Sequence, residues 1–137
     1  MLNENSVIKF NANVKSPRRF VFVLMENFTL LSFSSALDAL RIANRMSGKT
    51  LYEWTFIGEN EGVVSCSAGT QFKLDNSLIE LHRDDTVLLC GGTSIQEATT
   101  KKLIGWLRRE ARRGLTIGGL CTAAYPMAKA GLLDEKK

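Results

Sequence analysis

The chain has 137 residues, 45% of them hydrophobic, which suits one domain with a buried core and excludes a multidomain protein. Its net charge of +4, from 18 basic and 14 acidic residues, is too small an excess to indicate nucleic-acid binding by itself. No apolar run approaches the roughly 20 residues of a membrane span, and residues 1–5 are too polar for a secretory signal, so we expect a cytoplasmic protein without a membrane partner.

Three cysteines, Cys66, Cys90 and Cys121, leave an odd number and form no C-x-x-C pair. This spacing argues against a disulfide framework and against a zinc site. We therefore expect reduced thiols, no metal and no cofactor.

The N-terminal half is predicted to begin with a leader, residues 1–17, in which apolar and polar residues alternate from 8 to 15. The alternation indicates an edge strand, and disorder at a chain terminus is the alternative. The continuous apolar run 20–25 is typical of a strand buried on both faces. Helical spacing of apolar residues from Phe33 to Ala43 then predicts a helix that ends at Ser47-Gly48.

Two further strands and a hairpin follow. Aromatic and β-branched residues predict a strand over 52–57, and residues 63–74 resemble a short hairpin broken near Gly69. The run 86–90 predicts a core strand that stops at Gly91-Gly92. The pattern Ser94-x-x-Glu97 is a capping box, and it predicts one long amphipathic helix from Ile95 to the arginines before Gly114.

The most informative stretch is residues 117–124, where an apolar run stops at two glycines, presents Cys121 and continues into small helix-forming residues. Small residues at Gly119 and Ala123 are what a strained strand-to-helix turn with an exposed nucleophile requires. A thiol there would lie at a helix N-terminus, which favours the thiolate and attracts anions. A buried structural cysteine beside a glycine-rich turn remains an equally good interpretation of this short motif.

The order of elements predicts an α/β fold, a doubly wound, mainly parallel sheet with right-handed crossovers. Ligands of such sheets bind beyond the carboxyl ends of the strands. That edge is expected to collect residues 26–28, 91–94 and 119–122 from three strands. A pocket that includes Cys121 is therefore predicted.

Three segments taken together resemble the ThiJ/PfpI superfamily, whose members share a flavodoxin-like, class I glutamine amidotransferase-like fold. They are residues 87–92, 119–123 and 128–134. Segments 27–29, 40–44, 47–49 and 51–52 are most similar to the N-terminal domains of AraC-type transcriptional regulators of glycine betaine, carnitine and arginine catabolism. The resemblance runs from about Arg19 to the chain end.

The resemblance implies an incomplete ThiJ/PfpI-like domain over 18–137, truncated at its C-terminus. Two helix-turn-helix units would follow it in such a regulator, so the protein is expected to meet DNA only through a domain outside this chain. The resemblance also implies at least one exposed sheet edge or apolar helix face, which a homodimer could cover.

Two departures from the enzymatic members of the superfamily bear on activity. The position of their carboxylate, near the start of the first helix, is aligned with Ser32, and no acid replaces it. The histidine that would pair with the cysteine follows the elbow helix in the family, whereas the sole histidine here is His82, which precedes the third core strand. We therefore expect no catalytic residue in this chain, unless Cys121 acts as a nucleophile.

Three functions remain open. The preferred one is a sensor in which a small metabolite bound at the elbow changes how paired subunits present their DNA-binding parts. The alternative is a cysteine hydrolase, hydratase or amidase with Cys121 as nucleophile and the Thr122 N–H in an oxyanion hole. The third is a redox sensor that works through oxidation of Cys121.

The effector class suggested by the resemblance is a zwitterionic amino acid or quaternary amine. Its carboxylate would be received by the N–H groups of Cys121 and Thr122, and its cation by the ring of Phe28 or Tyr125, unless both rings only pack the fold. The complete set of predicted ligand-binding residues is Cys121, Thr122, Gly91, Gly92, Ser32, Phe28 and Tyr125.

Overall fold

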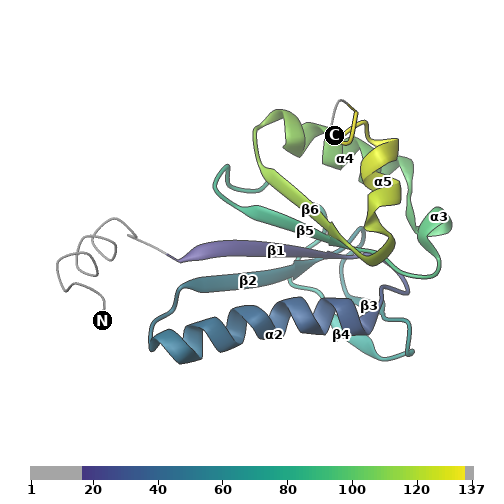
Figure 1. Cartoon of the computed structure of the whole chain (residues 1–137). Helices are drawn as coiled ribbons and strands as arrows, with labels where there is room; N and C mark the ends of the chain where they lie inside the picture. Colours follow the sequence, from purple (N-terminus) through teal and green to yellow (C-terminus); the bar gives the residue numbers. More distant parts are fainter. Residues whose placement is uncertain (1–16, 135–137) are drawn as a thin grey trace.

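A four-stranded parallel sheet forms the centre of the protein in the computed structural model, which describes residues 17–134 (Figure 1). The predicted leader strand at 8–14 lies outside the described residues. The sheet strands stand in the order β2-β1-β5-β6, and a hairpin of β3 and β4 lies apart from them. The strands are β1 (Arg18–Leu24), β2 (Tyr52–Ile57), β3 (Val63–Ser65), β4 (Gln71–Lys73), β5 (Thr86–Cys90) and β6 (Thr116–Leu120).

Helices cover the two faces of the sheet. Figure 1 shows α2 (Leu30–Ser47) on one face and α4 (Lys101–Arg112) with α5 (Ala124–Lys129) on the other. The parallel register pairs Val21 with Val87 and Phe22 with Leu88 across β1 and β5. A doubly wound α/β sheet is therefore confirmed.

Alternation along β1 explains why this strand is apolar from Phe20 onward. Val21 and Val23 pack toward α4 and α5, whereas Phe22 and Leu24 pack toward α2. All four side chains are buried. Both faces of this strand pack against a hydrophobic core, so neither face can carry polar residues. This is the physical reason for the continuous apolar run.

The predicted helix ending is confirmed at Gly48. Its φ of 69° is left-handed, and its N–H donates to the carbonyls of Asn44 and Arg45. Glycine adopts this backbone conformation without the steric cost that a Cβ would add.

The prediction of one long helix after Ser94 is wrong. The chain forms a short α3 (Ile95–Ala98), breaks at Thr99, and begins α4 after Thr100. The Ser94 side chain makes no capping bond, because its Oγ accepts from Asn27 Nδ2 at 2.8 Å. Thr100 Oγ1 instead accepts from Leu103 N at 3.1 Å, so Thr100 is the working N-cap.

The last strand is longer than predicted. β6 continues through Gly118 and Gly119 to Leu120, which pairs with Cys90. A Cβ on Gly119 would lie 2.8 Å from Met127 Sδ and 3.0 Å from the Ala123 Cβ. The glycine is needed for the close approach of the following helix, and it does not end the strand.

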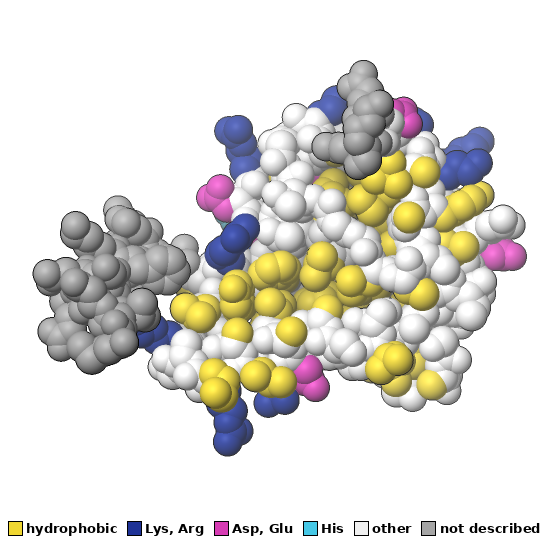
Figure 2. Space-filling view, in the orientation of Figure 1, with side chains coloured by type: hydrophobic (Ala, Val, Ile, Leu, Met, Phe, Trp, Pro, Cys, Tyr) yellow, Lys and Arg dark blue, Asp and Glu magenta, His cyan; other side chains and the backbone are white. Residues whose placement is uncertain are grey.

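Hydrophobic side chains remain at the surface on the α2 side of the sheet. Leu31, Ile42 and Met46 of α2 are 75%, 47% and 81% exposed. Figure 2 shows a band of hydrophobic side chains between α2 and α5 in this view. No helix in the described part of the chain is long and apolar enough to cross a bilayer.

Candidate functional site

Three loops meet at the carboxyl edge of the sheet, as the sequence predicted. The N–H of Thr29, after β1, donates to the carbonyl of Gly91, after β5, at 2.9 Å. The Thr122 hydroxyl, after β6, donates to the carbonyl of Gly92 at 2.8 Å. Loops from β1 and β6 are thereby joined through the glycine pair between them, and this junction is the candidate site.

The glycine pair allows backbone to pack against backbone. A Cβ on Gly92 would lie 2.0 Å from the carbonyl oxygen of Asn27, and a Cβ on Gly91 would lie 2.8 Å from Thr122 Oγ1. Asn27 itself has a φ of 62°, which bends the loop toward Gly92. Atoms of the neighbouring loops therefore fill the space beside each glycine. The two glycines allow the loops of the site to pack closely, and this space is not open to a ligand.

Cys121 occupies a strained turn. Its φ of 57° is left-handed, which is uncommon for a residue with a Cβ, and it joins β6 to the 3₁₀ turn η1 (Cys121–Ala123). The residue is exposed. Strain, exposure and the small residues around it match the nucleophile-elbow geometry expected from the sequence. The interpretation as a buried structural cysteine is wrong.

The partner of the Cys121 thiol is Thr29. Their Oγ1 and Sγ atoms lie 3.1 Å apart, and either can donate. Thr29 is not among the residues predicted at the site, although its position just before α2 marks a helix N-cap. The Ser32 hydroxyl, one turn further on, donates to the Thr29 carbonyl at 3.2 Å and so supports the residue that contacts the thiol.

No carboxylate or imidazole forms a hydrogen bond with Cys121 among residues 17–134. His82 is exposed and precedes β5, at the opposite edge of the sheet, where its backbone N–H donates to Asp85 Oδ2 at 2.9 Å. The expectation that His82 cannot serve the cysteine is confirmed. The thiol therefore faces a hydroxyl that is a poor proton acceptor at neutral pH.

Phe28 must be removed from the predicted ligand-binding residues. Its side chain is fully buried, and its ring packs edge-on against Phe33 and Phe72 at centroid distances of 5.3 and 5.5 Å. A cation cannot reach a ring enclosed in this way. Tyr125 is half-buried and stays accessible, with Lys129 Nζ 5.5 Å from its ring centroid.

The other two thiols are buried. Burial raises the pKa of Cys90 from its ordinary 9.0 to about 12, because the thiolate would lose its hydration. The described residues contain no group of three or more His, Cys, Asp or Glu side chains that could hold a metal ion.

Comparison with known proteins gives a consistent result. A model of the DJ-1/PfpI family matches residues 18–137. The HTH-type transcriptional regulators GbdR and CdhR of Pseudomonas aeruginosa are similar in sequence. GbdR is 38% identical over 88% of this chain and 33% of its own length, and CdhR is 36% identical over 86% and 35%. The chain thus spans about a third of the length of these relatives.

Solved structures extend the likeness to the fold. An AraC family transcriptional regulator from Pseudomonas putida superposes with a TM-score of 0.72 and 27% identity, over 86% of this chain and 63% of that one. A DJ-1 superfamily protein from Agrobacterium tumefaciens superposes with a TM-score of 0.68 and 22% identity, over 86% and 61%.

Proposed function

The chain belongs to the DJ-1/PfpI family, and from this premise we propose that it binds a small metabolite at the Cys121 edge as the sensor domain of an AraC-type transcriptional regulator. Two chains pair, and bound metabolite changes how the pair presents DNA-binding domains that lie outside this chain. Similarity to GbdR, CdhR and the Pseudomonas putida regulator supports the regulatory role. Differential affinity of the metabolite for two arrangements of the pair supplies the coupling.

The observation that carries the proposal is the environment of the Cys121 thiol. An exposed cysteine in a strained turn is available to a ligand, yet its hydrogen-bond partner is the Thr29 hydroxyl. General acid–base catalysis contributes typically 10²–10⁴-fold to a reaction and needs a group that takes up and returns a proton. A hydroxyl serves binding better than it serves proton transfer.

The ligand class follows from the groups around the turn. The N–H groups at Cys121 and Thr122 begin a helical segment, where backbone donors without intrahelical partners receive a carboxylate. Tyr125, half-buried one turn later, has an aromatic ring that the Lys129 ammonium contacts at 5.5 Å, and a ligand's cationic group would take the place of that ammonium. We therefore propose a zwitterion such as glycine betaine, carnitine or arginine as the effector.

Calorimetric titration of the intact regulator with these three compounds tests the proposal. Tyr125→Ala is expected to weaken binding roughly two- to tenfold, in keeping with the strength of a cation–π contact. Thr29→Val, which removes the hydroxyl beside the thiol, is expected to weaken it as well, and Thr50→Val is the matched control because Thr50 is exposed in the loop between α2 and β2, at the opposite edge of the sheet. Failure of all three zwitterions to bind would eliminate the ligand class.

The strained φ of Cys121 also favours a second candidate, a cysteine hydrolase, hydratase or amidase. In that mechanism Cys121 attacks the substrate carbonyl, and the Thr122 N–H stabilises the oxyanion. We expect no turnover of amide, ester or glyoxal-type substrates. Turnover that disappears in Cys121→Ser would replace the sensor by the enzyme.

A further inference from the structure

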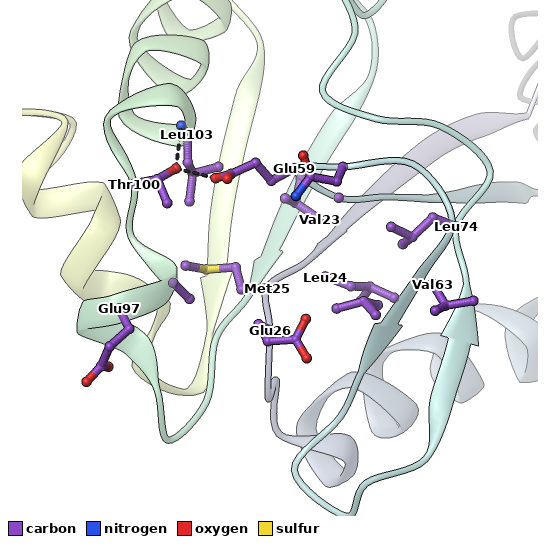
Figure 3. Close-up of a pocket in the computed structure, with 14 residues that line it drawn as sticks. Val23, Leu24, Met25, Glu26, Glu59, Val63, Leu74, Glu97, Thr100 and Leu103 are labelled. Carbon is purple, nitrogen blue, oxygen red and sulfur yellow. Dashed lines mark hydrogen bonds between the residues drawn. The ribbon is translucent and has the colours of Figure 1, made fainter.

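A second cavity opens at the same edge of the sheet, where β1 and β2 end, and its lining does not include Thr29, Cys121 or Thr122. Its volume is about 200 Å³, and the residues around it come from the end of β1, the loop after β2, the hairpin and the α3–α4 segment (Figure 3). Its floor is apolar and buried, with exposed fractions between 1% and 7%. The floor residues are Val23, Leu24, Met25, Leu74 and Leu103.

The ionisable side chains that line the cavity are all acidic. They are Glu26, Glu59 and Glu97, and no lysine or arginine lines it. None of the three forms an ion pair within the described residues. In Figure 3, Glu26 lies between the end of β1 and the hairpin, Glu59 reaches across the cavity to hydrogen-bond Thr100, and Glu97 points outward from the rim. The cavity therefore joins an apolar floor to negative charge.

This combination does not suit a metal ion. Calcium needs six to eight oxygen ligands and magnesium a near-octahedral set, whereas the floor here is hydrocarbon. The carboxylates also do not converge, since no three acidic, histidine or cysteine side chains among residues 17–134 could share one ion. A cation that fits must carry an apolar body of its own.

We propose that this cavity binds a small aliphatic ammonium ion without a carboxylate, either an alkylamine or a short diamine. The alkyl part displaces water from the floor, and the ammonium group lies toward Glu26 and Glu59. The volume is below the roughly 300–1,000 Å³ of pockets for drug-sized ligands, so the ligand has few non-hydrogen atoms. A zwitterion is disfavoured because its carboxylate would meet like charge.

Titration of the intact chain with four compounds of similar length tests the ligand class. The compounds are n-butylamine, 1,4-diaminobutane, neutral 1-butanol and zwitterionic 4-aminobutanoate, followed by the chemical shifts of the Met25 and Leu103 methyl groups. We expect both amines to shift these signals at lower concentration than the alcohol or the zwitterion, with affinity that falls as salt is added. Absence of amine binding, or equal binding of amine and alcohol, would overturn the proposal.

Charge-neutralising variants locate the site. Glu26→Gln is expected to weaken amine binding roughly two- to fivefold, the scale of an exposed ion pair. Glu59→Gln adds to the loss, and its amide oxygen can still accept from Thr100, so the fold is preserved. Glu61→Gln is the matched control, because this exposed residue lies outside the cavity. Unchanged binding in both cavity variants, or loss of binding in Cys121→Ser, would refute the assignment to this cavity.

Discussion

Cys121 and Cys90 stand at the carboxyl ends of neighbouring strands and have opposite chemistry. Cys90, on β5, points into the α2-side core, where burial raises its pKa to about 12. Cys121 is the first residue after β6. Its left-handed backbone conformation directs the thiol outward, toward the Thr29 hydroxyl. One residue beyond a strand end is enough to separate a buried hydrophobic side chain from an exposed thiol.

We expect Cys121 to be alkylated faster than Cys66 and Cys90 by a large factor, since only Cys121 is exposed. Mass spectrometry after brief treatment with iodoacetamide would rank the three thiols. Thr29→Val reports whether the hydroxyl affects the Cys121 rate. Preferential labelling of Cys66 or Cys90 would contradict the assignment of the elbow.

The raised pKa of Cys90 predicts how the free energy of unfolding depends on pH. Its folded pKa of about 12 is above the ordinary 9.0, so the unfolded chain loses this proton first as the pH rises. Stability from the neutral thiol is complete below about pH 9 and declines toward pH 12, by up to about 1.4 kcal/mol per pH unit. Urea unfolding between these values should show a shallower decline in Cys90→Ala than in the unchanged chain.

At the scale of elements, a glycine can raise or lower the stability of the fold, depending on the atoms that surround it. Gly92 contacts the Asn27 backbone, so an added Cβ forces the loops after β1 and β5 apart. Gly105 lies inside α4, and an added Cβ there meets no atom within 4 Å. The first glycine is required by packing, and the second only lowers helix propensity.

We therefore expect Gly105→Ala to stabilise the protein by about 0.5–1 kcal/mol. Gly92→Ala is expected to destabilise it by roughly 2 kcal/mol or more, because backbone atoms must move. Urea denaturation of the two variants, which add the same methyl group, provides the measurement. A stable Gly92→Ala protein would show that the loop junction is looser than its distances indicate.

At the scale of the whole molecule, α2 carries a row of exposed apolar side chains. Leu31, Ile42 and Met46 lie at spacings of eleven and four residues, which places them on one face of the helix. Their exposure is high for large apolar side chains. Such a row is typical of an interface rather than of a solvated helix face.

We expect the intact protein to dimerise through this face, and the double variant Ile42→Glu, Met46→Glu to shift the equilibrium toward monomer by roughly tenfold or more, since both charges would be buried in the dimer. Sedimentation velocity over a range of concentrations measures this. Arg112→Glu, at an exposed position of α4 on the other face of the sheet, is the control. A dimer that persists in the double variant would place the interface elsewhere.

Much of the fold was determined by the sequence alone, because the relevant signals are local. The apolar run 20–25, the bounds 52–57 and 86–90, the stop at Gly48 and the meeting of three loops at one edge followed from periodicity, turn residues and the rules of parallel sheets. The strained turn at Cys121 was likewise expected from the small residues on either side of it.

Only the tertiary structure decided the points that depend on contacts between distant segments. The Asn27 amide donates a hydrogen bond to the Ser94 hydroxyl. The capping box therefore does not form, and Thr100 is the N-cap of α4. Phe28 turns into the aromatic core, where its ring packs against Phe33 and Phe72. Thr29 reaches Cys121 across 92 residues of sequence. The partner of a side chain is the neighbour in space with which it forms its hydrogen bond or packing contact at the lowest free energy. Residue type and sequence spacing do not contain that information.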